Sequence, residues 1–161
     1  MTTIDLIHSG PSFLESCLRF LNSAKDEICI STFRFENPEN KKTKAIDLFF
    51  LSLIAAKNRK VKIKILVNLF SEKERLGQIN KKTAMVLKTY GITCRRPPAR
   101  ITNHAKLLII DRKRLILGSH NITKHSFNES FECSIKITDH KMIDQVCNVF
   151  DTAYNLATPI C

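Results

Sequence analysis

Four polar residues near the middle of the chain have types and spacing that suit phosphodiester chemistry. His104 and Lys106 are two positions apart, so both point to the same face of a strand, and Ser119 and Asn121 follow a second apolar run. An ammonium group and a carboxamide can bind the non-bridging oxygens of a phosphodiester. A histidine can attack phosphorus, or act as an acid near neutral pH. We therefore expect these four side chains to form a phosphodiester-cleaving site.

A β-hairpin must bring the four residues together. The apolar runs 106–110 and 115–118 flank the charged turn 111–114, which predicts two strands and their connection. Gly118 ends the returning strand, so Ser119 and Asn121 should arrive beside His104 and Lys106. The alternative is a buried hairpin that only happens to carry a His and a Lys at its mouth.

Metal chemistry has little support in the sequence. No cluster of carboxylates could hold Mg²⁺ for a two-metal mechanism. The six cysteines form no C-x-x-C pair and no other zinc spacing. We expect no metal and no other cofactor. Free thiols, together with an N-terminus unlike a signal peptide, favour a reducing, cytoplasmic setting.

At the hairpin the sequence resembles the phospholipase D superfamily, whose signature is H-x-K-x₄-D-x₆-G-S-x-N. Every specified position matches, and the six residues are His104, Lys106, Asp111, Gly118, Ser119 and Asn121. Six fixed positions make a chance match improbable. The surrounding pattern is similar to the short bacterial nuclease branch of the superfamily, which has one motif per chain.

The resemblance implies a covalent mechanism. The motif histidine, here His104, attacks phosphorus to give a phosphohistidine, and a second motif histidine protonates the leaving oxygen. The motif aspartate, Asp111, is expected to be structural or orienting. A downstream glutamate in the family contacts the other ring nitrogen of the nucleophile, and Glu132 has the matching spacing. In a strand 131–137 Glu132 would face away from the apolar side, which also fits an ordinary solvent-facing acid.

A single motif leaves the mechanism one histidine short, because no other histidine is followed by Lys two positions later. We therefore predict a two-fold homodimer in which a second copy supplies the other His104. The interface should involve the helix 43–58 or the motif hairpins. His120 and His125 are interpreted as surface residues, and the alternative is that either one tunes contacts with the substrate.

Charge patterning indicates a polyanionic partner. The chain carries a net charge of +11, which fits nucleic acid or an acidic membrane surface. Between Lys41 and Arg100 there are 16 Lys and Arg against three acids, whereas the remaining residues carry 10 and 12. The positive excess is therefore confined to one stretch, which we interpret as a phosphate-binding face.

The nucleic-acid contacts are assigned to basic residues in and beside this stretch. Three arginines flank the stiff Pro97-Pro98 pair just before the motif, where loops at strand ends build ligand sites. A solvated linker with no partner is the alternative. The predicted contacts are Arg95, Arg96, Arg100, Lys41, Lys42 and Lys124.

Hydrophobic periodicity predicts one α/β domain over 1–161, a mixed sheet sandwiched by helices in a phospholipase D-like fold. The predicted helices are 12–24, 43–58, 81–90 and 140–156. The predicted strands are 27–35, 61–69, 92–95, 106–110, 115–118 and 131–138.

The predicted function is a metal-independent endonuclease that acts as a homodimer, on DNA in preference to RNA. One alternative is a phospholipase D-type enzyme on phospholipid headgroups, and another is a non-catalytic nucleic-acid-binding module. No stable membrane association is expected, because the longest apolar stretch, 45–56, is too short and too polar to cross a bilayer.

Overall fold

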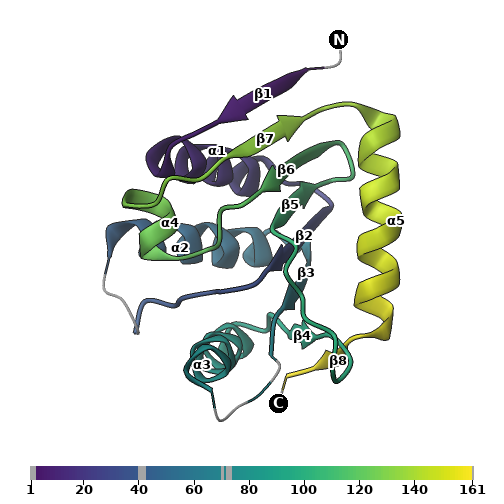
Figure 1. Cartoon of the computed structure of the whole chain (residues 1–161). Helices are drawn as coiled ribbons and strands as arrows, with labels where there is room; N and C mark the ends of the chain where they lie inside the picture. The colour runs from purple at the N-terminus through teal and green to yellow at the C-terminus, as the bar shows by residue number, and fades with distance from the viewer. Residues whose placement is uncertain (1–2, 40–42, 70, 72–73, 161) are drawn as a thin grey trace.

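The computed structural model describes residues 3–39, 43–69, 71 and 74–160, and within them eight strands form one sheet. The strands are β1 Ile4–Ile7, β2 Glu27–Thr32, β3 Lys62–Val67, β4 Cys94–Arg96, β5 Leu107–Ile110, β6 Arg114–Gly118, β7 Ser134–Ile137 and β8 Thr158–Pro159. The helices are α1 Gly10–Ser23, α2 Lys44–Asn58, α3 Arg75–Thr89, α4 Lys124–Asn128 and α5 His140–Leu156. Helices α1 to α4 lie on one side of the sheet and α5 on the other (Figure 1).

The sheet is mixed, in the order β1-β7-β6-β5-β2-β3-β4-β8. Strands β2, β3 and β4 are parallel, and the other neighbours are antiparallel. Strand β5 pairs with β2, so the motif hairpin lies in the middle of the sheet. The predicted α/β fold with a mixed sheet between helices is confirmed.

Two apolar layers explain why the middle of β2, from Ile28 to Ile30, is apolar on both of its faces. Ile28 and Ile30 pack into the larger core beneath α1 and α2, whereas Cys29 packs into the smaller core beneath α5. A strand buried on both faces has no alternation of polar and apolar residues. No helix in the described ranges is long and apolar enough to cross a membrane.

Three short elements and several boundaries differ from the sequence-based expectations. Strand β2 ends at Thr32 rather than at 35, and α1 begins at Gly10 rather than at 12. Strands β1 and β8 lie at the two edges of the sheet, and α4 is a single short helix. Helix α3 begins at Arg75 rather than at 81. Strand β7 begins at Ser134 rather than at 131, so Phe131 is not in a strand facing the core and is 98% exposed. Edge strands and single-turn helices give weak periodic signals because few of their residues are buried.

Asp111 anchors the turn between β5 and β6. Its carboxylate accepts hydrogen bonds of 2.8–3.2 Å from the backbone amides of Lys25, Asp26 and Glu27. Burial acts to raise the pKa of Asp111, but these amides and Arg114 outweigh it and hold the pKa below its usual value. The motif aspartate therefore joins the hairpin to the start of β2, at the end of β5 opposite to His104.

Replacing Asp111 by Ala should reduce the free energy of unfolding by about 3 kcal/mol, because three backbone amides lose a charged acceptor. A lowered folded-state pKa means that this stability is present above pH ~4 and is lost as the pH falls through the folded pKa. Urea titrations at pH 7 and pH 3 measure both effects.

The control for this prediction is Asp5→Asn, which removes a carboxylate that is half-exposed and paired with Lys136. It should change the stability by less than about 1 kcal/mol. Equal losses in the two variants would contradict the anchoring role of Asp111.

Candidate active site

The motif residues other than Asp111 meet at one end of the sheet, where β2, β3 and β4 finish and β5 begins. Ser31 of β2 pairs with Leu107, and Leu107 pairs with Leu117 of β6. The amide of Gly118 donates to the carbonyl of Lys106 at 3.2 Å. This register brings the segment before β5 beside the segment after β6. The structure therefore gathers His104, Lys106, Ser119 and Asn121 at the same end, and it leaves Asp111 at the other.

Lys106 is buried and its ammonium faces the exposed His104. Nζ of Lys106 lies 3.0 Å from Nδ1 and 3.1 Å from Nε2 of His104, and it donates to the carbonyl of His104 at 2.8 Å. Burial lowers the pKa of Lys106, and the carboxylate of Glu132 partly offsets that effect. A phosphate entering this site would meet a cation and an imidazole side by side.

Asn121 is oriented by the end of β2. Its Oδ1 accepts hydrogen bonds from the amide of Arg34 at 3.0 Å and from Oγ1 of Thr32 at 3.2 Å. Because Oδ1 already accepts these two hydrogen bonds, the NH₂ group of Asn121 is the part that remains available to a ligand. An NH₂ group can only donate hydrogen bonds. That is the polarity needed to bind a phosphate oxygen.

Ser119 holds the segment that carries Glu132. The amide of Ser119 donates to the carbonyl of Cys133 at 2.9 Å, and the amide of Cys133 donates to Oγ of Ser119 at 3.0 Å. Glu132 is therefore fixed next to the site from a loop, and not from a strand as the sequence pattern predicted. The Ser119 hydroxyl is exposed and already serves as an acceptor for the backbone, so its first role here is structural.

Buried asparagines that the sequence analysis missed fix the loop before His104. Asn103 donates to the carbonyls of Thr32 and Leu66 and accepts from Oγ of Ser31. The amide of Asn103 donates to Oδ1 of Asn68 at 3.0 Å. These bonds tie the segment before β5 to the ends of β2 and β3. Asn68, which directly follows the apolar strand β3, was the feature of the sequence that could have indicated this role.

Phe33 and Arg34 are two further neighbours that sequence reasoning did not single out. The ring of Phe33 lies 4.9 Å from the ring of His104, centroid to centroid, and 5.6 Å from Nζ of Lys106. Arg34 forms an ion pair with Glu36 at 2.7 Å. Both follow β2, so the end of this strand forms one wall of the site.

The structure separates the predicted nucleic-acid contacts into exposed residues and residues that contact other parts of the protein. Arg96 and Arg100 are exposed near the site end of β4. Arg95 is partly exposed, but its Nη1 donates to the carbonyl of Tyr154 at 3.1 Å and its guanidinium lies over the Tyr154 ring, so it holds the end of α5. Lys124 is partly exposed and 3.6 Å from Glu129.

The basic stretch does not form one continuous face. Lys41 and Lys42 lie outside the described residues. Lys64 pairs with Glu27 at 2.9 Å and with Asp151 at 3.0 Å, beneath α5. Some of the excess charge is therefore used to join the sheet to α5. Across the described ranges, no three His, Cys, Asp or Glu side chains come close enough together to hold a metal ion.

Residues 17–154 match the family model described as "Cardiolipin synthase, PLD-like domain". This match covers most of the chain, so the protein belongs to the phospholipase D-like family. A search of curated protein sequences finds no match.

Solved structures show the same fold. Nuc from Salmonella typhimurium, a phospholipase D family member, is similar with a TM-score of 0.78 at 21% identity, covering 99% of this chain and 98% of that chain. NucT from Helicobacter pylori has a TM-score of 0.78 at 16% identity, covering 99% of each chain. Phosphatidylserine synthase from Haemophilus influenzae has a TM-score of 0.72 at 15% identity and covers 92% of this chain but 36% of its own. The predicted family is confirmed, and so is the likeness to its short members.

Replacing Asn103 by Ala should destabilise the protein by about 2 kcal/mol, because two strand-end carbonyls and a serine hydroxyl lose their partner. Thermal unfolding followed by circular dichroism measures the loss. The matched control is Asn22→Ala, at an exposed position of α1, where little change is expected. If both variants unfold at the wild-type temperature, Asn103 does not fix this loop.

Proposed function

We propose that this protein is a metal-independent phosphodiesterase that cleaves nucleic acid as an endonuclease. The observation that carries the proposal is the meeting of His104, Lys106 and Asn121 at one end of the sheet, in a chain of the phospholipase D-like family. His104 attacks phosphorus and forms a phosphohistidine, while Lys106 and the NH₂ group of Asn121 bind the non-bridging oxygens. Water then releases the product. Glu132 is proposed to orient His104 electrostatically, from the loop before β7.

Charge favours nucleic acid as the substrate, and we propose DNA in preference to RNA. Arg96 and Arg100 are exposed on the same end of the sheet as His104. The archaeal chromatin protein TrmBL2, whose structure shows a mode of DNA binding, shares the fold with a TM-score of 0.62 at 18% identity, covering 96% of this chain and 52% of its own. Exposed arginines such as Arg96 and Arg100 can contact the phosphate backbone without reading the base sequence.

The mechanism needs a second histidine, which we propose comes from a second copy of the chain. His120 is 2% exposed and cannot reach a substrate. His125 pairs with Glu129 on the outside of α4. In a two-fold dimer, His104 of the partner subunit protonates the leaving oxygen, so each chain supplies one half of the site. Residues 1–161 would act as a single domain in this assembly.

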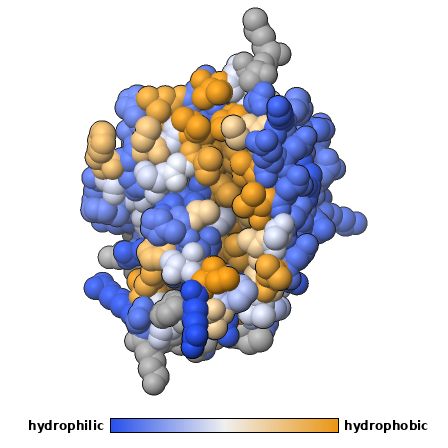
Figure 2. Space-filling view, turned by 45° about the vertical axis from the view of Figure 1, so that its right-hand side comes forward, coloured by the Kyte–Doolittle hydropathy of each residue, from blue (hydrophilic) through white to orange (hydrophobic). Residues whose placement is uncertain are grey.

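The second copy has a suitable surface beside the motif hairpin. Leu107, Leu117, Ile135 and Leu6 are paired across β5, β6, β7 and β1 and form one row on the α5 side of the sheet. Leu6 is 62% exposed, and the other three are only partly buried. Figure 2 shows an apolar stripe on this side of the molecule, beside the hydrophilic surface of α5. The row starts next to Lys106, so a dimer formed here would bring two sites together.

A phospholipid headgroup enzyme is the second candidate, because it would use the same phosphodiester chemistry. The fold similarity to phosphatidylserine synthase favours it. The apolar stripe could then face lipid instead of a second copy. Assays on vesicles therefore accompany those on nucleic acid.

The direct test is cleavage in excess EDTA. Wild-type protein should cleave plasmid DNA without added metal, because the proposed site has no carboxylate set to lose. His104→Asn should reduce cleavage by at least about 10³-fold, since one substitution removes nucleophile and acid together. It should still bind DNA in a mobility-shift assay. The protein should not hydrolyse phosphatidylcholine in vesicles.

Several outcomes would overturn the proposal. Cleavage that disappears in EDTA and returns with Mg²⁺ contradicts the metal-independent mechanism. Unchanged cleavage by His104→Asn removes the catalytic assignment. Hydrolysis of the vesicles without cleavage of DNA favours the lipid enzyme.

The dimer predicts a mass of about twice 18.4 kDa in light scattering at micromolar concentration. Leu6→Asp should weaken association by at least about tenfold, because the two-fold axis places like charges in one interface. Leu51→Asp is the matched control, since Leu51 is equally exposed but lies on α2. Dissociation by Leu51→Asp alone would move the interface to α2, and a monomer that still cleaves DNA would require a different acid.

Replacing Arg96 and Arg100 together by Ala should weaken DNA binding for all sequences. The slope of log affinity against log salt should fall by about one unit for each DNA phosphate that the variant no longer neutralises. Lys113→Ala is the control, because Lys113 is exposed at the opposite end of the hairpin. An unchanged salt slope in the double variant would exclude this loop from the phosphate path.

A further inference from the structure

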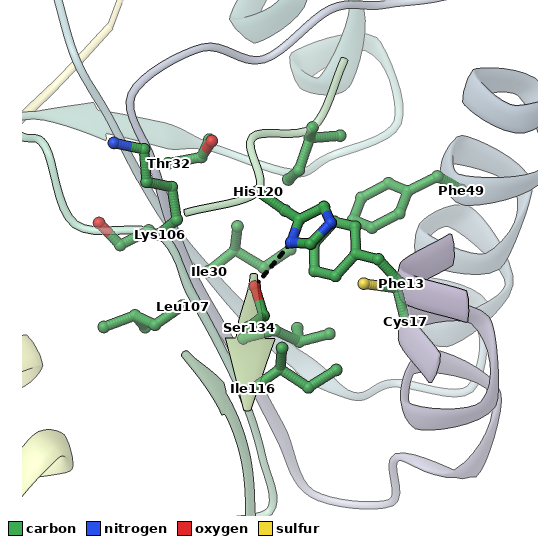
Figure 3. Close-up of a pocket in the computed structure, with 13 residues that line it drawn as sticks. Phe13, Cys17, Ile30, Thr32, Phe49, Lys106, Leu107, Ile116, His120 and Ser134 are labelled. Atoms are coloured by element: carbon green, nitrogen blue, oxygen red, sulfur yellow. Dashed lines mark hydrogen bonds between the residues drawn. The ribbon is translucent and has the colours of Figure 1, made fainter. Parts of the chain in front are cut away.

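His120 lies in the interior of the protein, although its place in the motif suggested a surface residue. It stands between Ser119 and Asn121 and is 2% exposed. Its ring stacks on Phe13 of α1, with centroids 4.2 Å apart and planes 18° apart. Nδ1 lies 2.8 Å from Oγ of Ser134, and Nε2 is buried without a hydrogen-bond partner among the described residues. Figure 3 shows the imidazole lying against Phe13, beside α1.

The motif glycine makes room for this arrangement. Gly118 and Ser134 are paired directly across β6 and β7. A Cβ atom at position 118 would lie 2.2 Å from Oγ of Ser134 and 2.4 Å from the carbonyl oxygen of Cys133, which no side chain tolerates. The absence of a side chain at Gly118 therefore lets the Ser134 hydroxyl reach across to His120. Glycine, serine and histidine form one packed unit directly behind the active site.

His120 shares a small cavity with two parts of the site. The cavity holds about 20 Å³, room for a single water, and both His120 and Lys106 line it. Thr32, which bonds Oδ1 of Asn121, lines it as well. In Figure 3 the side chains of Lys106 and His120 enclose this region from opposite sides. A change in the volume of the His120 side chain would therefore alter a cavity that Lys106 and Thr32 also line.

The electrostatics favour a neutral imidazole at this position. Burial lowers the pKa of His120, and Glu132 partly offsets that effect. Glu132 has the same influence on Lys106. An imidazole kept neutral adds no charge beside the ammonium that must bind phosphate. The neutral imidazole can still form one hydrogen bond with the Ser134 hydroxyl, whereas a phenyl ring could not.

We propose that His120 is a positioning residue, which holds Asn121 and Lys106 in their phosphate-binding geometry through its contacts with Ser134 and Phe13. The inference rests on the proposed function of the site as a phosphodiesterase. His120 does not touch the substrate. It acts as the packed support of the Ser119–Asn121 turn.

The test compares His120→Phe, Ser134→Ala and the double variant by steady-state cleavage of a DNA oligonucleotide. Each single change removes the same hydrogen bond, so each should lower kcat by about tenfold while KM stays near the wild-type value. The double variant should be no slower than the slower single variant, because the two residues act as one unit.

Two amide substitutions separate positioning from simple space filling. His120→Asn places an amide close to the position of Nδ1 and should recover part of kcat. His120→Gln carries its amide farther out, toward the position of Nε2, and should not. All variants are assayed well below their melting temperatures. A lower melting temperature with full kcat, or equal kcat for the Asn and Gln variants, would overturn the proposal.

Failure of the proposed function remains distinguishable from failure of this inference. If the wild-type protein cleaves and His120→Phe cleaves equally well, only the role of His120 is lost. If the wild-type protein cleaves nothing, the proposed function fails. The affinity for inorganic phosphate, measured from the imidazole NMR signals of His104, then reports on positioning alone. Weaker phosphate binding in His120→Phe than in wild type supports the inference, and equal binding contradicts it.

Discussion

The register of one hairpin determines where every motif side chain lies. Leu107 opposite Leu117, and the Gly118 amide on the Lys106 carbonyl, place residues that are 15 positions apart in the sequence at the same end of the sheet. A shift of one residue would turn Lys106 to the other face of β5. The Asp111 carboxylate, bonded to three amides at the start of β2, fixes the turn of the hairpin against such a shift. Asp111 and Gly118 thus determine the geometry of the motif residues for which we propose a chemical role.

Hydrogen bonds of polar side chains fix the loops around the site in the same way. Asn121 uses its oxygen to bind the end of β2, which leaves a donor for phosphate. Asn103 satisfies two strand-end carbonyls and thereby places the segment before His104. A buried amide is costly unless its partners are present, so Asn103 restricts the loop before His104 to one arrangement. A rigid site of this kind suits catalysis by charge stabilisation, because the donors are in place before the substrate arrives.

The sequence predicted the parts of the structure that depend on strong local patterns. Alternating Val and Ile predicted β3, and the two apolar runs on either side of the charged turn 111–114 predicted the hairpin. It could not predict the burial of His120, because a polar residue in a turn is usually exposed, and only the space left by Gly118 and the ring of Phe13 reverse that expectation. Nor could it show that Arg95 contacts Tyr154, since a basic residue in a short strand has the same pattern whether it binds phosphate or holds a helix. Tertiary contacts decide both cases.

The central claim is that His104 attacks phosphorus and carries the phosphoryl group. The most direct measurement is mass spectrometry of the protein after rapid quenching of a reaction with an oligonucleotide in EDTA, followed by digestion at neutral or basic pH to preserve phosphohistidine. The account predicts a nucleotide adduct on the peptide that contains His104, absent from His104→Asn. Cleavage with no adduct, or with an adduct on a different residue, would contradict it.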